Sequence, residues 1–130
     1  MRFLIDTNRY SDFVRNVPEV FERFVSAREI LVPFIVAAEL RCGFLAGVQA
    51  KRNEVVFDEF LSNRHVRILF ADNETIRTYA SIYAELRKNG TPIPVNDMWI
   101  AALAVQHSLP LYTRDQHFDN IPQLSRILPP

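Results

Sequence analysis

The chain has 130 residues, 48% of them hydrophobic, and 15 basic side chains balance 15 acidic ones. This length suits one domain, and a domain of this size can bury a core without disulfides. The zero formal net charge argues against a protein that binds nucleic acid tightly and without selectivity, because such proteins are usually basic. An enzyme that contacts a short stretch of RNA is not excluded. We expect a single domain over residues 1–130.

The sequence contains no pattern typical of secretion or of a membrane span. Only Phe3-Leu4-Ile5 separate the first two residues from Asp6, too few for the core of a signal peptide. The longest apolar run, Met98–Val105, is far below the roughly 20 residues that a spanning helix needs. The single cysteine, Cys42, lies in an apolar segment and is expected to be buried. A lone cysteine fits a reducing cytosol, so we predict a cytoplasmic protein.

The first half of the chain predicts two strands, each followed by helix. Arg2–Ile5 is a short apolar run and is expected to form the first strand. Ser11–Val25 has helical spacing of apolar residues, and Pro18 is expected to split it into two helices. A second strand is expected at Glu29–Val32, and an unbroken helix at Phe34–Ala46.

The second half continues the alternation. Asn96 is expected to be the N-cap of an apolar helix that runs to about His107. Strands alternating with helices predict an α/β fold with a parallel sheet covered on both faces. The remaining elements are expected to be helices at Gln49–Ser62 and Asp72–Lys88 and strands at Val66–Phe70, Leu109–Thr113 and Leu124–Leu128.

Two acidic residues follow predicted strands. Asp6 comes directly after the first strand, and Asp115 lies just past Leu109–Thr113. Ligands of open parallel sheets bind beyond the carboxyl ends of the strands, which makes both acids candidate site residues. Asp6 is equally well interpreted as the N-cap of the next helix, and a lone loop aspartate such as Asp115 is by default a turn residue. Asp119 lies further from the strand and is interpreted as part of a turn.

Glu39 lies in a helix that is apolar on nearly every side. Its neighbours along the helix face are Cys42, Gly43 and Ala46, so that face is expected to pack inward. A buried carboxylate is costly unless it is neutral, paired or bound to a cation. The alternative to a cation is a salt bridge with an arginine such as Arg41.

Asp97 opens the last predicted helix. Ala101 and Ala104 follow it on the same face, and this stripe of small side chains lets the helix lie close to the sheet. Asp97 would then come near the strand ends. The alternative is that Asp97 only stabilises the helix dipole, but Asn96 is expected to supply the cap already.

If these four acids converge, their mutual repulsion calls for a cation. A cluster of carboxylate oxygens suits Mg²⁺ or Mn²⁺, and the three histidines show no zinc-binding spacing. Such a cation activates water and neutralises charge on a phosphodiester. No Ser–His or Cys–His pattern competes as a nucleophilic site.

Four motifs resemble those of PIN-domain nucleases, and more narrowly of the VapC-type toxins of bacterial toxin–antitoxin pairs. They are Leu4–Asn8, Ala38–Leu40, Asn96–Ala102 and Thr113–Phe118, in the family's order and spacing. The resemblance implies a three-layer α/β/α domain with a mostly parallel central sheet. It implies a Mg²⁺- or Mn²⁺-dependent endoribonuclease that acts on structured RNA such as tRNA. It also implies a homodimer and a cognate antitoxin that covers the active site.

The resemblance also implies roles for individual residues. Asp6 and Asp97 are the expected direct metal ligands, and the other two acids would complete the site for hydrolysis by metal-activated water. Arg114 is interpreted either as an RNA-backbone contact or as an ion-pairing residue. The positions that match the family's acids are Asp6, Glu39, Asp97 and Asp115, and those that match its supporting polar residues are Thr7, Asn8 and Thr113.

Other functions remain as alternatives. A phosphatase with a strand-end aspartate nucleophile would need a second Asp two residues later, where this chain has Asn8. A receiver-like regulatory domain would need an adjacent acidic pair after the first strand and an aspartate acceptor in the middle of the chain, and this sequence has neither at the right place. A PIN-like RNA-processing nuclease outside a toxin–antitoxin pair is open, as is an RNA-binding domain that does not cut. The intact acids argue against the last of these.

Overall fold

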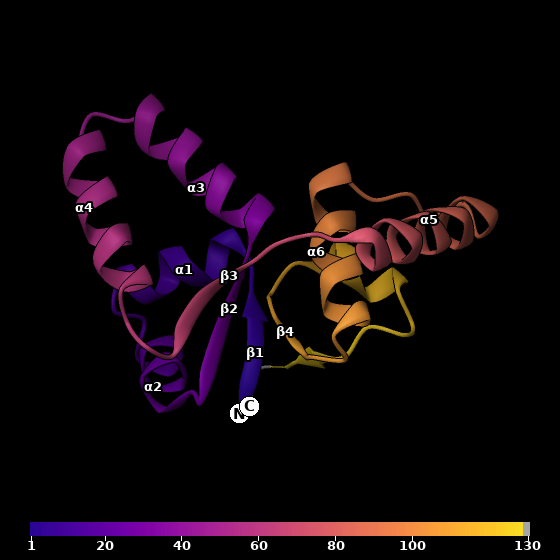
Figure 1. Ribbon diagram of the computed structural model, residues 1–130, viewed down its shortest axis with the longest axis horizontal. Coiled ribbons are helices and arrows are strands. Elements are labelled where there is room, and N and C mark those ends of the chain that lie inside the picture. Colours follow the sequence, from indigo (N-terminus) through magenta and orange to yellow (C-terminus); the bar gives the residue numbers. More distant parts are fainter. Residues whose placement is uncertain (129–130) are drawn as a thin grey trace.

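The computed structural model describes residues 1–128 and shows a parallel sheet between two layers of helices (Figure 1). The strand order is β3-β2-β1-β4-β5, and every pairing is parallel. The predicted three-layer α/β/α fold is therefore confirmed, whereas a single domain over 1–130 stays a prediction. The strands are β1 (Arg2–Ile5), β2 (Glu29–Pro33), β3 (Val66–Leu69), β4 (Leu111–Tyr112) and β5 (Arg126–Ile127).

The first strand lies in the middle of the sheet, between β2 and β4. Leu4 pairs with Leu31 of β2 on one side and with Leu111 of β4 on the other. All three leucines are fully buried, because a strand covered on both faces must be apolar throughout. From β1 the chain runs outward to β2 and β3 on one side and then crosses back to β4 on the other side, so the strand order reverses at β1. A crevice beyond the carboxyl ends of such neighbours is the usual ligand site of open α/β sheets.

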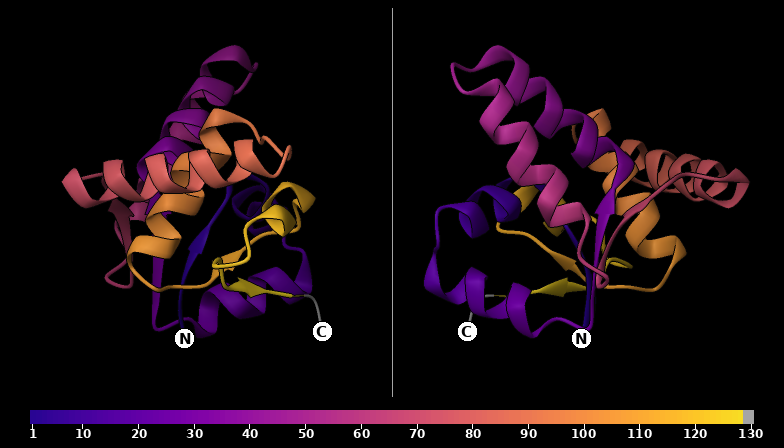
Figure 2. Two further views of the ribbon diagram at one scale, coloured as in Figure 1. Left: turned by 90° about the vertical axis from the view of Figure 1, so that its right-hand side faces the viewer. Right: turned by 60° about the vertical axis from the view of Figure 1, so that its left-hand side comes forward.

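Helices from the two halves of the chain cover opposite faces of the sheet (Figures 1 and 2). Pro18 separates the first two helices as predicted, but the first begins earlier than expected, directly after Asp6. No helix among residues 1–128 is long and apolar enough to cross a membrane. The helices of the first half are α1 (Thr7–Val14), α2 (Pro18–Ser26), α3 (Phe34–Ala46) and α4 (Ala50–Leu61), and those of the second half are α5 (Asn73–Lys88), α6 (Val95–Gln106) and the 3₁₀ helix η1 (Gln116–Asn120).

The prediction that Asn96 caps α6 is wrong. The N-cap is Pro94, and Asn96 lies within the first turn of the helix. Pro94 has an extended backbone, with φ of −56° and ψ of 147°, and the helix begins at the next residue. The amide of Asn96 is then free to donate to the Glu39 carboxylate across the site, with 3.3 Å between Nδ2 and Oε2.

The prediction that Cys42 is buried is also wrong, because its side chain is exposed. Helices α3 and α4 project as a hairpin beyond the end of the sheet (Figure 1). Along the outer part of α3 only one side is covered, so Gly43 and Ala46 are exposed and Leu45 is 76% exposed. The apolar character of this helix therefore did not mean burial on every side. The prediction that the helix face of Glu39 packs inward is therefore wrong for Cys42, Gly43 and Ala46, which are exposed. Glu39 itself is half-buried.

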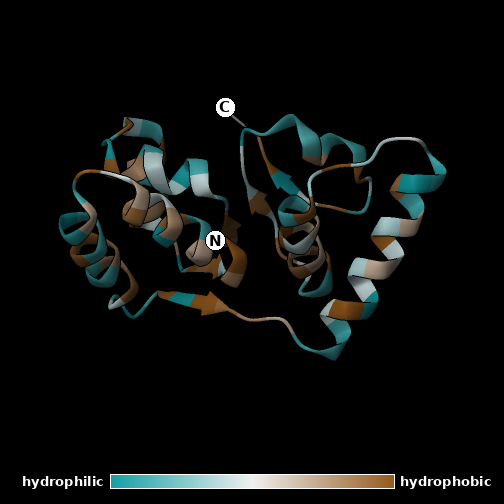
Figure 3. Cartoon of the chain, turned by 90° about the horizontal axis from the view of Figure 1, so that it is seen from above, coloured by the Kyte–Doolittle hydropathy of each residue, from teal (hydrophilic) through white to brown (hydrophobic). Residues whose placement is uncertain are grey.

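The hydropathy colouring of Figure 3 places apolar residues on the strands and along the sheet-facing sides of the helices. Aromatic rings fill the layer between the sheet and the helices of the first half. Phe24 lies fully inside this layer, with its ring 4.6 Å from Phe13 and 6.0 Å from Phe60, measured between centroids. This packed layer holds α1 against the sheet and fixes the position of Asp6, which immediately precedes that helix.

Candidate active site

The structure brings the four predicted acids to one pocket at the carboxyl end of the sheet. The pocket has a volume of about 240 Å³. Asp6 directly follows β1, Glu39 comes from α3, Asp97 lies in the first turn of α6, and Asp115 follows β4. Residues far apart in the sequence meet here because β1 and β4 are neighbours. The lining also includes Thr7, Asn8 and Ile100.

Asp6 both caps a helix and faces the pocket. Its Oδ1 accepts a hydrogen bond from the backbone N–H of Arg9, at 2.9 Å, and this bond caps α1. Its Oδ2 accepts a hydrogen bond from the hydroxyl of Thr113. Asp6 is only 6% exposed, and this burial raises the pKa of its carboxyl despite the two hydrogen bonds. The cap that the sequence offered for Asp6 is therefore confirmed, and the same carboxylate lies at the pocket, where its role as a site residue stays a prediction.

Thr113 connects the acids that follow β1 and β4. Its buried hydroxyl donates to Asp6 and accepts from the backbone N–H of Asp115, with 3.0 Å between N and Oγ1. One side chain thus fixes the spacing of two carboxylates that belong to different strands. This contact gives a physical basis for the supporting position that the motif predicts.

Glu39 is held by neutral donors. Its Oε1 accepts from the hydroxyl of Thr7 at 3.2 Å, and its Oε2 accepts from the amide of Asn96 at 3.3 Å. Arg41, the ion-pair partner considered from the sequence, instead binds Glu54 and Asp58 on α4. Asn96 is a site residue that the sequence analysis missed. The signal was Pro94, because a helix that begins directly after a proline places Asn96 in its first turn.

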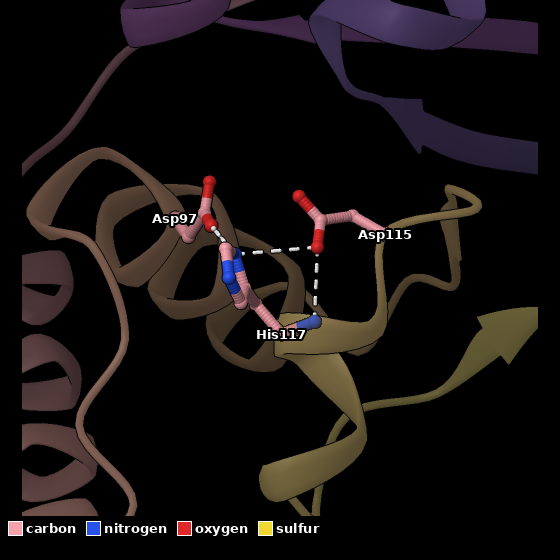
Figure 4. Close-up of side chains that lie close together, drawn as sticks. All are labelled: Asp97, Asp115 and His117. Carbon is pink, nitrogen blue, oxygen red and sulfur yellow. Dashed lines mark hydrogen bonds and ion pairs between the residues drawn. The ribbon is translucent and has the colours of Figure 1, made fainter.

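His117 completes the site in a way that the sequence analysis did not anticipate. Its Nδ1 lies 2.9 Å from Asp97 Oδ2 and 3.2 Å from Asp115 Oδ1 (Figure 4). Burial raises the pKa of Asp97, and the hydrogen bond to Asp97 raises the pKa of His117. A histidine–cysteine zinc spacing cannot identify His117, because its ring pairs with Asp97 of α6 and with Asp115, the N-cap of its own helix.

Arg114 forms an ion pair with Asp12 of α1. Its Nε lies 3.2 Å from Asp12 Oδ2, and the same oxygen is 3.5 Å from Nη1 of Arg9. Of the two roles considered for Arg114, the ion-pairing one is found. Of its neighbours in the sequence, Thr113 donates a hydrogen bond to Asp6 and Asp115 lines the pocket, so this ion pair ties the loop that carries them to the helix that Asp6 caps.

The raised pKa values of Asp6, Asp97 and His117 predict how stability depends on pH. Each group binds its proton more tightly in the folded than in the unfolded chain, so the free energy of unfolding falls as pH rises. We expect the Tm of the metal-free protein to increase when the pH is lowered from about 7.5 to about 5.5. Thermal unfolding in a chelator measures this. A Tm that decreases over the same interval would contradict it.

The donor set fits a hard divalent cation. Four carboxylates converge, two of them with a raised pKa, and together they offer the oxygen ligands that Mg²⁺ and Mn²⁺ prefer. Two of these acids, Asp97 and Asp115, have ligand atoms within 4.8 Å of one another and of the His117 ring. Burial, and to a smaller extent the charge of Asp115, raises the pKa of Asp6 and of Asp97, and a cation there would offset both effects.

Comparisons with known proteins agree with this geometry. Residues 3–124 match the PIN domain. Toxin FitB of Neisseria gonorrhoeae is 33% identical over 122 residues, which cover 86% of each chain. Ribonuclease VapC5 of Mycobacterium tuberculosis is 32% identical over 96 residues, covering 69% of this chain and 71% of that one.

Solved structures are similar over nearly the whole chain. The structure of VapBC2 from Rickettsia felis, bound to a DNA fragment from its promoter, gives a TM-score of 0.88 at 25% identity and covers 98% of both chains. FitAcB from Neisseria gonorrhoeae gives 0.81 at 29% identity, covering 98% of this chain and 97% of that one. The motifs, the sheet order and these matches agree: the chain belongs to the PIN-domain family, as a VapC-type member.

Proposed function

We propose that this protein is a metal-dependent endoribonuclease and the toxin of a toxin–antitoxin pair. The observation that carries the proposal is the convergence of Asp6, Glu39, Asp97 and Asp115 on one pocket beyond the ends of β1 and β4. The ribonuclease and toxin names of its relatives support the same activity.

In this proposal Asp6 and Asp97 hold the ion directly, and Glu39 and Asp115 complete the site. A bound Mg²⁺ or Mn²⁺ supplies Lewis acidity and a water molecule that is easily deprotonated. The protein's own contribution is orientation. Thr113 fixes the carboxylate of Asp6, while Thr7 and Asn96 fix that of Glu39. Asn8 is exposed at the pocket, where an RNA strand can reach it.

The partners belong to the proposal as well. We place the protein in the cytoplasm as a homodimer that cleaves tRNA or another structured RNA. A cognate antitoxin covers the pocket and inhibits cleavage. The solved structures of VapBC2 and FitAcB, to which this chain is similar, support such a partner.

The experiment combines metal removal with an expression test. Purified protein is incubated with tRNA and Mg²⁺ or Mn²⁺. We expect cleavage that EDTA abolishes and that excess metal restores. Cleavage undiminished by EDTA would contradict the metal requirement, and intact RNA under all metal conditions would contradict the nuclease. Induced expression should arrest growth until the antitoxin gene is co-expressed. Normal growth would favour an RNA-processing nuclease outside a toxin–antitoxin pair.

A further inference from the structure

The imidazole of His117 lies between two of the site's carboxylates and has no role in the function proposed above. Its Nδ1 is 2.9 Å from Asp97 Oδ2 and 3.2 Å from Asp115 Oδ1 (Figure 4). The side chain is 53% exposed, so solvent and small ions can reach the ring. This placement raises the question of whether His117 only pairs with the acids or also binds the cation.

The ring is held in place by the structure around it. Asp115 caps η1 by accepting the backbone N–H of His117, with 2.9 Å between N and Oδ1. The next residue, Phe118, is 1% exposed and anchors this turn in the core. The backbone position of His117 is therefore set by this cap and by its buried neighbour, and the contacts with Asp97 and Asp115 orient the ring.

The distances match those within one coordination sphere. An octahedral ion with bonds of about 2.1 Å holds adjacent ligand atoms about 3.0 Å apart. The two distances from His117 Nδ1, 2.9 and 3.2 Å, are close to that value. The three ligand atoms of Asp97, Asp115 and His117 all lie within 4.8 Å of one another, so one ion can contact them together.

We propose that Nδ1 of His117 is a ligand of the divalent cation, together with Asp97 and Asp115, and that this nitrogen makes the site prefer Mn²⁺ to Mg²⁺. The inference rests on the metal-dependent function proposed above. Mg²⁺ binds oxygen ligands and holds its waters, whereas imidazole is a donor that transition metals accept. A site made only of carboxylates would have no nitrogen ligand that favours Mn²⁺ over Mg²⁺.

Pulsed EPR on the untagged protein loaded with Mn²⁺ tests the ligand directly. We expect a ¹⁴N hyperfine coupling from a bound imidazole in the wild type, and its loss in His117→Ala and His117→Gln. The glutamine can still hydrogen-bond to the acids but offers no imidazole nitrogen. His107→Ala is the matched control, because His107 lies outside the pocket at the end of α6, and the coupling should persist there.

Metal affinities give a second readout. Calorimetry should show that His117→Ala weakens Mn²⁺ binding by about 10- to 100-fold, the range typical of changes around metal sites, and Mg²⁺ binding by less. Bound Mn²⁺ without a ¹⁴N coupling in the wild type would overturn the inference and leave the metal-dependent nuclease intact. A coupling that survives in His117→Ala, or equal losses of Mn²⁺ and Mg²⁺ affinity, would also overturn it. Binding of Mg²⁺ without Mn²⁺ would overturn it as well, whereas absence of any binding of either ion would instead contradict the proposed function.

Discussion

Asp97→Asn is expected to lower the rate of RNA cleavage by about 10³-fold, and Asp6→Asn to lower it similarly. A metal ion supplies several kcal/mol of charge stabilisation in such reactions, and each 1.36 kcal/mol corresponds to about a tenfold change in rate. The amide is nearly the same size as the carboxylate but carries no charge. Single-turnover cleavage of a labelled RNA, measured with saturating Mg²⁺ or Mn²⁺, gives the rates.

Asp119→Asn is the matched control for these variants. Asp119 lies in η1 near the site but forms an ion pair with Arg126 instead of lining the pocket. Its substitution should leave cleavage within about twofold of the wild type, as for a substitution away from the reacting groups. Undiminished cleavage by both Asp6→Asn and Asp97→Asn would refute the assignment of the site.

Asp6→Asn should also raise the stability of the metal-free protein while it lowers the rate of cleavage. Burial raises the pKa of Asp6, so its charged form costs free energy in the metal-free protein at neutral pH. The asparagine oxygen can still cap α1, and its amide can donate to Thr113. We therefore expect the metal-free variant to melt at a higher temperature than the wild type, and to gain less Tm when metal is added. A lower Tm would mean that the charge is already compensated without a cation.

Asp12→Ala is expected to lower the free energy of unfolding by about 3–5 kcal/mol, the usual result when one partner of a buried ion pair is removed. Asp12 is 7% exposed, and the side chain of its partner Arg9 is also 7% exposed. The guanidinium of Arg9 lies over the ring of Tyr112, 4.2 Å from the centroid, where water cannot replace the lost carboxylate. Denaturant unfolding followed by circular dichroism measures the difference.

An exposed ion pair provides the comparison for Asp12. Glu74 pairs with Arg77 on α5, with 2.7 Å between Oε1 and Nη2, and both side chains are more than 60% exposed, at 64% and 69%. Glu74→Ala should therefore cost at most about 1 kcal/mol. If Asp12→Ala and Glu74→Ala lower the free energy of unfolding by similar amounts, Arg9 must find another partner when Asp12 is absent.

Periodicity and breaker residues were sufficient to predict most of the fold. The run Arg2–Ile5, the unbroken pattern of Phe34–Ala46 and the proline at 18 each predicted an element at the observed position. These signals are local, because the side chains that make the pattern also make the element. The predicted start of α6 is two residues too late, because Asn96 favours a cap position but the helix begins directly after Pro94.

What could not be predicted depends on contacts between distant segments. Composition alone made α3 appear buried, but the sheet ends before the α3–α4 hairpin does, which leaves Cys42 exposed. Three of the acids could be selected singly because each follows a strand or begins a helix, and Glu39 could be selected because its helix is apolar on nearly every side. The side chains that hold these acids in place could not be predicted. The hydrogen bond from Asn96 to Glu39 and the contact of His117 with Asp97 form only when the helices pack together.

The central position of β1 also bears on how the protein folds. Strands β1, β2 and β3 join through successive crossovers, whereas β4 must close a loop of about a hundred residues before Leu111 meets Leu4. Contacts that distant form slowly, because the entropy of loop closure is lost before any pairing is gained. A chain that has formed only its first three strands holds Asp6 without Thr113 or Asp115. Such a partly folded chain would lack the complete active site and could not cleave RNA. The ribonuclease activity would therefore appear only when the sheet is complete.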